Sequence, residues 1–108
     1  MTDKYSYRFL PIAENDLVNT VLYIEQELSN PKAAKDFTIK LSKKIDDTRV
    51  FPLSGKAIDN KFIADKGLRQ FAVGNYIVFY KPDKETETII ILRIIYGGRD
   101  IDEILKTL

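Results

Sequence analysis

Basic and phenolic side chains that could act on a charged target occur in two apolar stretches of the sequence. Arg69 opens the first stretch, and Tyr76 follows the Gly-Asn pair that interrupts it. Arg93, Tyr96 and Arg99 lie in the second stretch and in the polar segment after it. Guanidinium groups hold phosphate or carboxylate, and a phenol donates a hydrogen bond or moves a proton. These five residues are therefore the candidates for target binding.

The sequence lacks the side chains on which most enzymatic chemistry depends. It contains no histidine and no cysteine. This excludes histidine general acid–base catalysis, Ser-His and Cys-His nucleophiles, and disulfides. A zinc site is not expected either, because only carboxylates remain as anionic ligands. We expect no metal and no cofactor.

Charge and hydropathy narrow the class of partner. The net charge is +1 and the pI is about 7.9, whereas domains dedicated to nucleic acid usually have a pI above about 9. Any contact with nucleic acid would therefore be local. No apolar run reaches the roughly 20 residues of a membrane span, and the N-terminus lacks the apolar segment of a signal peptide. Together with the lack of cysteine, this predicts a cytoplasmic protein without a membrane partner.

The spacing of apolar residues predicts a strand followed by two helices. Residues 5–9 alternate between aromatic and polar side chains, as in a half-buried strand. Apolar residues then recur at helical spacing over 12–28. Asn30 can cap a second helix, with Pro31 at its first position, and that helix runs to about Thr48. The short connection predicts an antiparallel helical hairpin.

Three strands and a short helix complete the expected fold. A connection of some 12 to 15 residues leads to strands over 68–73, 76–81 and 88–96, and a last helix follows at the C-terminus. The order β-α-α-β-β-β predicts the α+β class, with an antiparallel sheet covered by the N-terminal helical hairpin. Residues 1–108 are expected to form a single domain.

Strand 89–96 is expected to be buried on both faces, because it is rich in β-branched residues and shows no polar alternation. Arg93 inside such a strand is costly unless it is paired, so an ion pair is the structural alternative to target binding. Tyr96 could likewise be an aromatic residue at the edge of the core, with a solvated hydroxyl.

Ion pairs are also the structural alternative for the other two arginines. Arg69 could pair with Asp65 or Asp100 and so stabilise the sheet. Arg99 lies beside Asp100 and Asp102, where a surface ion pair is the default. The same residues thus have a functional and a structural interpretation at this point.

The order and spacing of six sequence pieces resemble the RelE/ParE superfamily of bacterial toxins from type II toxin–antitoxin systems. The resemblance covers nearly the whole chain. The pieces are Phe9-Leu10-Pro11 with Ala13 and Asp16-Leu17, Tyr23-Ile24, Asn30 to Phe37, Phe51-Pro52 with Gly55, Arg69 with Val73 to Tyr80, and Arg93 to Asp100. The resemblance implies a toxin that arrests growth, either by cleaving messenger RNA on the ribosome or by poisoning DNA gyrase.

Compared with the ribonuclease branch of this superfamily, most of the expected catalytic groups are missing. The positions of its two lysines fall at Leu68 and Gln70, and that of one arginine falls at Ile77. Its final tyrosine falls at Leu105, and only the arginine after the fourth strand is kept, as Arg99. Some relatives have a histidine where this chain has tyrosine at the end of the fourth strand.

The ParE-like branch is more similar, through Arg69, the Gly-Asn-Tyr turn and the Arg93 to Asp100 ending. We therefore expect a growth-arresting toxin that inhibits DNA gyrase without catalysis. The alternative is a ribosome-dependent mRNA interferase. That would be a metal-independent endoribonuclease with Arg69, Tyr96 and Arg99 as its phosphate-binding and proton-transfer groups. A third interpretation is a chain that has lost toxicity and still binds its antitoxin.

The resemblance also implies a cognate antitoxin that wraps over the toxin and silences it, with operator DNA contacted only through that antitoxin. The last helix is too short to be stable alone in water. It either docks on the sheet or leaves an apolar groove for an antitoxin helix. The residues expected to contact the antitoxin are Ile101, Ile104, Leu105 and Leu108.

Overall fold

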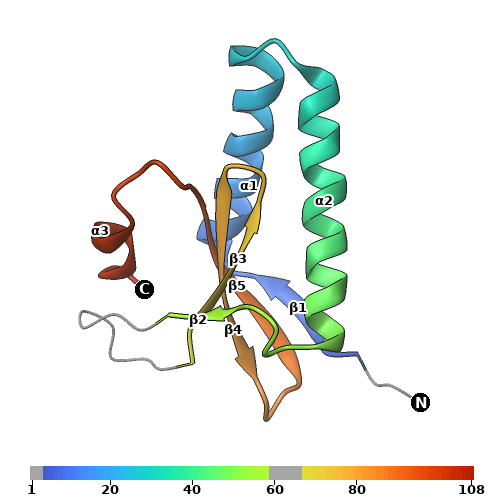
Figure 1. The fold of residues 1–108 in the computed structure, drawn as a ribbon, viewed down its shortest axis with the longest axis vertical. Helices are drawn as coiled ribbons and strands as arrows, with labels where there is room; N and C mark the ends of the chain where they lie inside the picture. Colours follow the sequence, from blue (N-terminus) through green and yellow to red (C-terminus); the bar gives the residue numbers. More distant parts are fainter. Residues whose placement is uncertain (1–3, 59–66) are drawn as a thin grey trace.

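A computed structural model describes residues 4–58 and 67–108 of the chain (Figure 1). It confirms the α+β class and the expected order of the main elements. The elements are β1 (Ser6–Phe9), α1 (Pro11–Leu22), the π-helical turn η1 (Tyr23–Glu27), α2 (Pro31–Val50), β2 (Lys56–Ala57), β3 (Arg69–Val73), β4 (Tyr76–Asp83), β5 (Thr88–Tyr96) and α3 (Ile101–Leu105).

The sheet is mixed, which corrects the expectation of an antiparallel sheet. Its five strands lie in the order β1-β5-β4-β3-β2. β1 runs parallel to β5, with Phe9 opposite Ile91, whereas the other pairs are antiparallel. The chain leaves β1 through the helical hairpin and β2 to β4 before β5 returns beside it, so a long crossover makes the parallel pairing possible. β2, the outer strand at the other edge, lies in the segment expected to be a loop.

The two long helices stand side by side and antiparallel, as predicted (Figure 1). Asn30 caps α2 through its Oδ1, which accepts a hydrogen bond from the Ala33 N–H at 3.0 Å, and Pro31 is the first helical residue. The first helix differs from the expected regular helix, because its last turn is the π-helix η1. Such wider turns are rare and occur frequently at functional sites.

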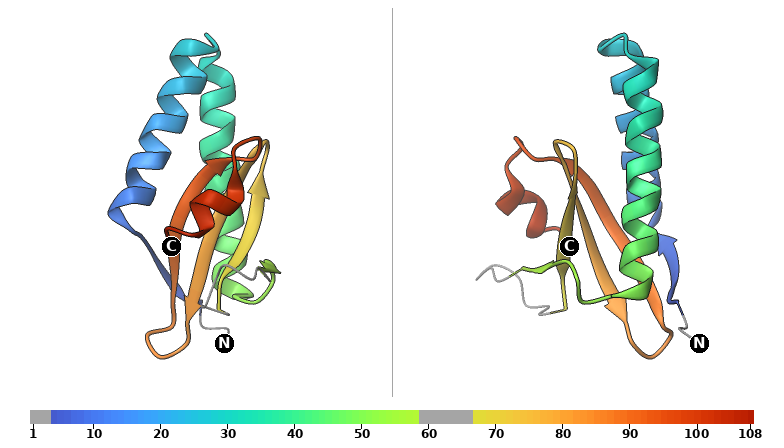
Figure 2. Two further views of the ribbon diagram at one scale, coloured as in Figure 1. Left: turned by 90° about the vertical axis from the view of Figure 1, so that its left-hand side faces the viewer. Right: turned by 45° about the vertical axis from the view of Figure 1, so that its right-hand side comes forward.

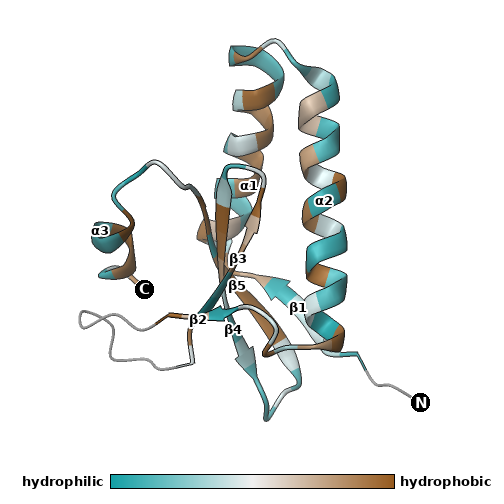
Figure 3. Ribbon diagram, viewed as in Figure 1, coloured by the Kyte–Doolittle hydropathy of each residue, from teal (hydrophilic) through white to brown (hydrophobic). Residues whose placement is uncertain are grey.

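Both faces of the sheet are covered, as the composition of strand 89–96 predicted. The helical hairpin packs on one face, around a core that includes Phe37, Leu41, Val78 and Ile91. On the other face lies α3 (Figure 2). Its buried Ile104 and Leu105 pack against Phe79 and Ile95. Figure 3, coloured by hydropathy, shows apolar residues along the strands that lie between these two layers.

One irregularity in β5 decides which side chains share a face. Phe79 on β4 pairs with Arg93, but its neighbour Tyr80 pairs with Ile91, so Leu92 is an extra residue on β5. Because side chains alternate along a strand, an extra residue reverses the alternation after it. Tyr96 consequently lies on the same face as the helical hairpin.

The described residues contain no helix that combines the length and the apolar character needed to cross a bilayer.

Candidate functional site

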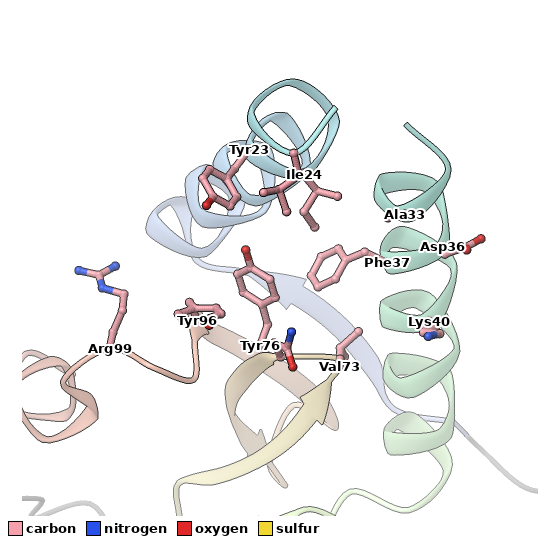
Figure 4. Close-up of a pocket in the computed structure, with 13 residues that line it drawn as sticks. Tyr23, Ile24, Ala33, Asp36, Phe37, Lys40, Val73, Tyr76, Tyr96 and Arg99 are labelled. Carbon is pink, nitrogen blue, oxygen red and sulfur yellow. The ribbon is translucent and has the colours of Figure 1, made fainter. Parts of the chain in front are cut away.

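The helical hairpin and the sheet diverge at one end and leave a groove of about 780 Å³ (Figure 4). Three groups of residues line it: the η1 turn and the start of α2, the β3–β4 turn, and the end of β5 with the segment after it. They are Tyr23, Ile24, Leu28, Ala33, Asp36, Phe37, Lys40, Val73, Gly74, Asn75, Tyr76, Tyr96 and Arg99. The groove is open to solvent, mostly apolar, and has charged groups at its rim.

Three separate features bring tyrosines to the groove. The π-helical turn begins at Tyr23, and the extra residue in β5 turns Tyr96 toward the hairpin. The β3–β4 turn places Tyr76 directly opposite Tyr96 across the β4–β5 pair. A hydrogen bond of 2.8 Å from the Gly97 N–H to the Asn75 carbonyl ties the end of β5 to that turn. The tyrosine positions are therefore fixed by backbone geometry on both sides of the groove.

The aromatic rings form a connected row across the floor of the groove. The ring centroids of Phe37 and Tyr76 are 5.3 Å apart, and those of Tyr76 and Tyr96 are 5.7 Å apart, both in edge-to-face arrangements. Burial raises the pKa of Tyr76, and the neighbouring phenols Tyr23 and Tyr96 raise it further. The Tyr76 hydroxyl is therefore a neutral hydrogen-bonding group at physiological pH and a poor general base.

Arg99 stands at the rim, across the groove from Lys40 and Asp36 (Figure 4). Its side chain is exposed, and the surface ion pair expected for it is not formed within the described ranges. Asp100, the partner nearest in sequence, instead caps α3 by accepting a hydrogen bond from the Glu103 N–H. The Arg99 N–H donates to the Tyr96 carbonyl at 3.1 Å, so a tight turn fixes its backbone. Its guanidinium is available to a ligand.

Arg69 lies at the other end of the sheet from this groove. It pairs with Tyr80 in the β3–β4 register, four residues from Tyr76, which corresponds to about 13 Å along the strand. Its guanidinium donates hydrogen bonds to the carbonyls of Leu53 and Gly55, at 3.0 and 2.8 Å. The expected partner Asp65 lies outside the described residues, and Asp100 caps α3 as noted above.

Arg93 has the buried partner that its structural interpretation requires. Its Nε donates to Asp16 Oδ2 at 2.7 Å, and a second guanidinium nitrogen donates to Oδ1 at 3.2 Å. Asp16 also accepts the Ile94 N–H at 3.0 Å. The two side chains are only 15% and 13% exposed. The pair joins α1 to β5, and target contact by Arg93 stays a prediction that this geometry does not favour.

The last helix takes the first of its two expected alternatives and docks on the sheet. Ile104 and Leu105 are buried in the chain's own core, and Ile101 packs beside them. Leu108 is exposed. An antitoxin would reach Ile104 and Leu105 only by displacing α3, so antitoxin contact through this helix stays a prediction.

Several groove residues were not among the sequence candidates. Tyr23, Phe37 and Lys40 come from the helical hairpin, where their spacing indicated only a core face or a solvated face. The exposure of Tyr23, an aromatic residue in the first helix, was not visible from its periodicity. Within the described ranges, no group of three histidine, cysteine, aspartate or glutamate side chains could hold a metal ion.

Comparison with known proteins agrees with this fold. The toxin–antitoxin complex RelBE2 from Mycobacterium tuberculosis contains a chain with a TM-score of 0.64 and 22% identity, and the match covers 92% of this chain and 98% of that one. The chromosomal ParDE system from P. aeruginosa contains one with a TM-score of 0.66 and 16% identity, covering 87% and 97%. No curated protein matches the sequence.

A family model identifies the chain more directly than these structures do. The model for the ParE toxin of type II toxin–antitoxin systems, parDE, matches residues 7–101. The match extends from β1 to the first residue of α3 and includes the whole groove. The chain belongs to the ParE toxin family of type II toxin–antitoxin systems.

Proposed function

We propose that this toxin arrests bacterial growth by binding DNA gyrase without catalysis, and that a cognate antitoxin neutralises it. The observation that carries the proposal is the separation of the candidate catalytic groups. Tyr96 and Arg99 share the groove, but Arg69 lies about 13 Å away along the sheet and is held by two backbone carbonyls. Cleavage of a phosphodiester requires its acid, base and cations at one position.

The chemistry of the groove suits a protein partner. Aromatic side chains and arginine supply much of the binding energy at protein interfaces. Here Tyr76 and Tyr96 form an aromatic floor, and Arg99 is an exposed guanidinium beside it. We infer that the gyrase surface bound in the groove offers an apolar side chain to the tyrosines and a carboxylate to Arg99.

Supercoiling by purified gyrase tests this proposal directly. The wild-type toxin should inhibit supercoiling, and its induction in cells should trigger a DNA-damage response. Arg99→Ala should weaken inhibition by about tenfold or more, since a charged contact in an interface contributes about 2 kcal/mol or more. Arg8→Ala, which removes an exposed arginine on β1, is the matched control and should inhibit like the wild type. Unchanged supercoiling at high excess of toxin would refute gyrase inhibition.

The same groove is our proposed site for the antitoxin. A partner segment could enter this groove without displacing α3, and its lining includes the candidate target residues Tyr76, Tyr96 and Arg99. A segment bound there would block gyrase by competition. The two similar structures come from toxin–antitoxin systems, which supports a cognate antitoxin for this chain.

Ribosome-dependent cleavage of messenger RNA is the second candidate, favoured by the presence of Arg99 and three phenols in one groove. A guanidinium could hold the scissile phosphate while a tyrosine protonates the leaving oxygen. Primer extension after induction would then reveal new 5′ ends within codons. If Arg99→Ala retained full cleavage, Arg99 would have no part in that reaction.

A further inference from the structure

The first three quarters of α2, as far as Ile45, carry a concentration of positive charge. Between Pro31 and Ile45 the helix has five lysines and a single acidic residue, Asp36. The segment therefore carries +4 in a chain with a net charge of +1, which leaves −3 for the remainder. The lysine row consists of Lys32, Lys35, Lys40, Lys43 and Lys44.

Most of the lysine row lies on the outward half of α2. At about 100° per residue, Lys32, Lys35, Lys40 and Lys43 fall on the half of the helix opposite its buried residues, whereas Lys44 lies on the flank of the helix nearer to Phe37. All five lysines are exposed, and none forms an ion pair within the described parts of the chain. Figure 3 shows the hydrophilic residues of α2 alternating with apolar ones along the helix.

The placement of these charges costs the helix stability. Lys32 lies in the first turn, which contains no acidic residue, although the helix dipole favours negative charge there. Lys32 and Lys35 are three residues apart, as are Lys40 and Lys43, and like charges at this spacing repel one another. Asp36, four residues from both Lys32 and Lys40, offsets part of this repulsion, and a polyanion bound along the helix would offset more of it.

We propose that the lysine row binds the phosphate backbone of double-stranded DNA. The row extends over about 18 Å, a length of duplex that carries about ten phosphates. Lys40 also lies at the rim of the groove, so the DNA-binding face continues into the proposed gyrase-binding surface. The biological use of this face rests on the proposed function: the toxin would contact gyrase and the DNA that gyrase holds at the same time.

The salt dependence of DNA binding by the full-length toxin tests the lysine row. A labelled 20-base-pair duplex would be titrated with toxin at several salt concentrations, and binding followed by fluorescence anisotropy. Each phosphate contact contributes about −0.9 to the slope of log K against log salt. Lys32→Gln/Lys43→Gln should therefore make the slope less steep by about 1.8, with weaker binding at low salt.

A control variant that loses the same number of lysines elsewhere distinguishes DNA binding by the lysine row from general electrostatic attraction between toxin and DNA. Lys4→Gln/Lys84→Gln removes two exposed lysines outside α2 and should leave the slope within about 0.5 of the wild type. An equal loss in both double variants, or no DNA binding by the wild type at low salt, would overturn the proposal. Tighter binding to duplex RNA of the same sequence would assign the row to RNA and overturn it as well.

The gyrase assay separates this inference from the proposed function. If the wild-type toxin leaves supercoiling unchanged while the lysine variant loses DNA binding, the gyrase proposal is refuted and the proposal that the lysine row binds DNA is supported. If the lysine variant binds DNA normally while Arg99→Ala loses gyrase inhibition, the gyrase proposal stands and the DNA face fails.

Discussion

At the scale of single residues, Asp16 connects the two layers of the fold. Its carboxylate accepts two hydrogen bonds from the Arg93 guanidinium and a third from the backbone of β5. These bonds offset the cost of burying both charges. Arg93 directly follows the extra residue Leu92. The ion pair therefore also fixes β5 at the point where the alternation of its side chains between the two faces changes.

Removal of one partner should reveal how strongly this pair holds α1 to the sheet. Asp16→Ala leaves the Arg93 guanidinium unpaired in a largely buried position, and we expect the free energy of unfolding to fall by about 3 kcal/mol. Urea denaturation measures the change. Asp36→Ala, at an exposed site on α2, should change the stability by less than about 0.5 kcal/mol. Equal effects of the two substitutions would contradict this account.

At the scale of elements, the buried Tyr80 phenol and Arg69 together hold the segment between α2 and β2 against the sheet. The Tyr80 hydroxyl donates to the Pro52 carbonyl and accepts the Gly55 N–H, each at 2.9 Å. Arg69 adds its two hydrogen bonds to the same segment. A Cβ atom at Gly55 would overlap the Tyr80 ring and hydroxyl, so the close approach requires glycine there. These contacts give Arg69 and Tyr80 a structural role far from the groove.

Loss of the Tyr80 hydroxyl should weaken this attachment. Tyr80→Phe leaves the Pro52 carbonyl and the Gly55 N–H without their partner, which should cost about 1–3 kcal/mol of stability. Tyr5→Phe removes a hydroxyl from a less buried tyrosine and serves as the control. Thermal denaturation would compare the two variants, and equal midpoints would contradict the role assigned to Tyr80.

The pKa values of Tyr76 and Tyr80 predict how stability depends on pH. Burial is the main cause of the raised pKa in both residues, and hydrogen bonding to Gly55 and the charge of Arg69 oppose it in Tyr80. A raised pKa in the folded state means that the unfolded chain releases these protons first. Their contribution to stability is therefore complete below about pH 10 and is lost above it. Denaturation from pH 8 to 11 should show this loss, with a shallower decline in Tyr80→Phe than in the wild type.

At the scale of the whole molecule, the sheet separates two helical layers with different roles. On one face α3 completes the core, and on the other the hairpin packs at one end of the sheet and opens into the groove at the other (Figures 1 and 2). The groove holds Tyr76, Tyr96 and Arg99 from the candidate target residues, and the lysine row continues from its rim along α2. The surfaces that we propose for gyrase, antitoxin and DNA are therefore continuous with one another.

A charge placed in the groove should separate partner binding from folding. Leu28 is 55% exposed and lines the groove, whereas Ile39 is 56% exposed on the outer side of α2. Leu28→Asp should weaken antitoxin binding by about tenfold or more, because a carboxylate would be buried against an apolar partner. Ile39→Asp should leave the affinity unchanged in isothermal titration calorimetry. Equal losses in both variants would place the antitoxin elsewhere.

The residue pattern determined most of the fold. Alternation and helical spacing predicted the helical hairpin, the three consecutive strands and the short last helix, because these signals are local. The Asn30-Pro31 start of α2 and the burial of β5 on both faces followed from the same local chemistry. The family could also be predicted from the sequence, since its motifs keep their order along the chain. The family model confirms this prediction.

Tertiary structure alone decided which candidate residues lie in the groove and which are bonded to other parts of the chain. The extra residue in β5 turns Tyr96 into the groove, and the π-helical turn brings Tyr23 to it. Neither irregularity has a signature in the sequence, because the pairing of distant strands and the packing of helices select them. For the same reason the sequence did not reveal that Arg93 and Arg69 are hydrogen-bonded to residues far away in the chain. Arg99 has no such partner within the described residues and lies at the rim of the groove. The chemical type of a side chain can be read from the sequence, but the partner that it contacts depends on the tertiary fold.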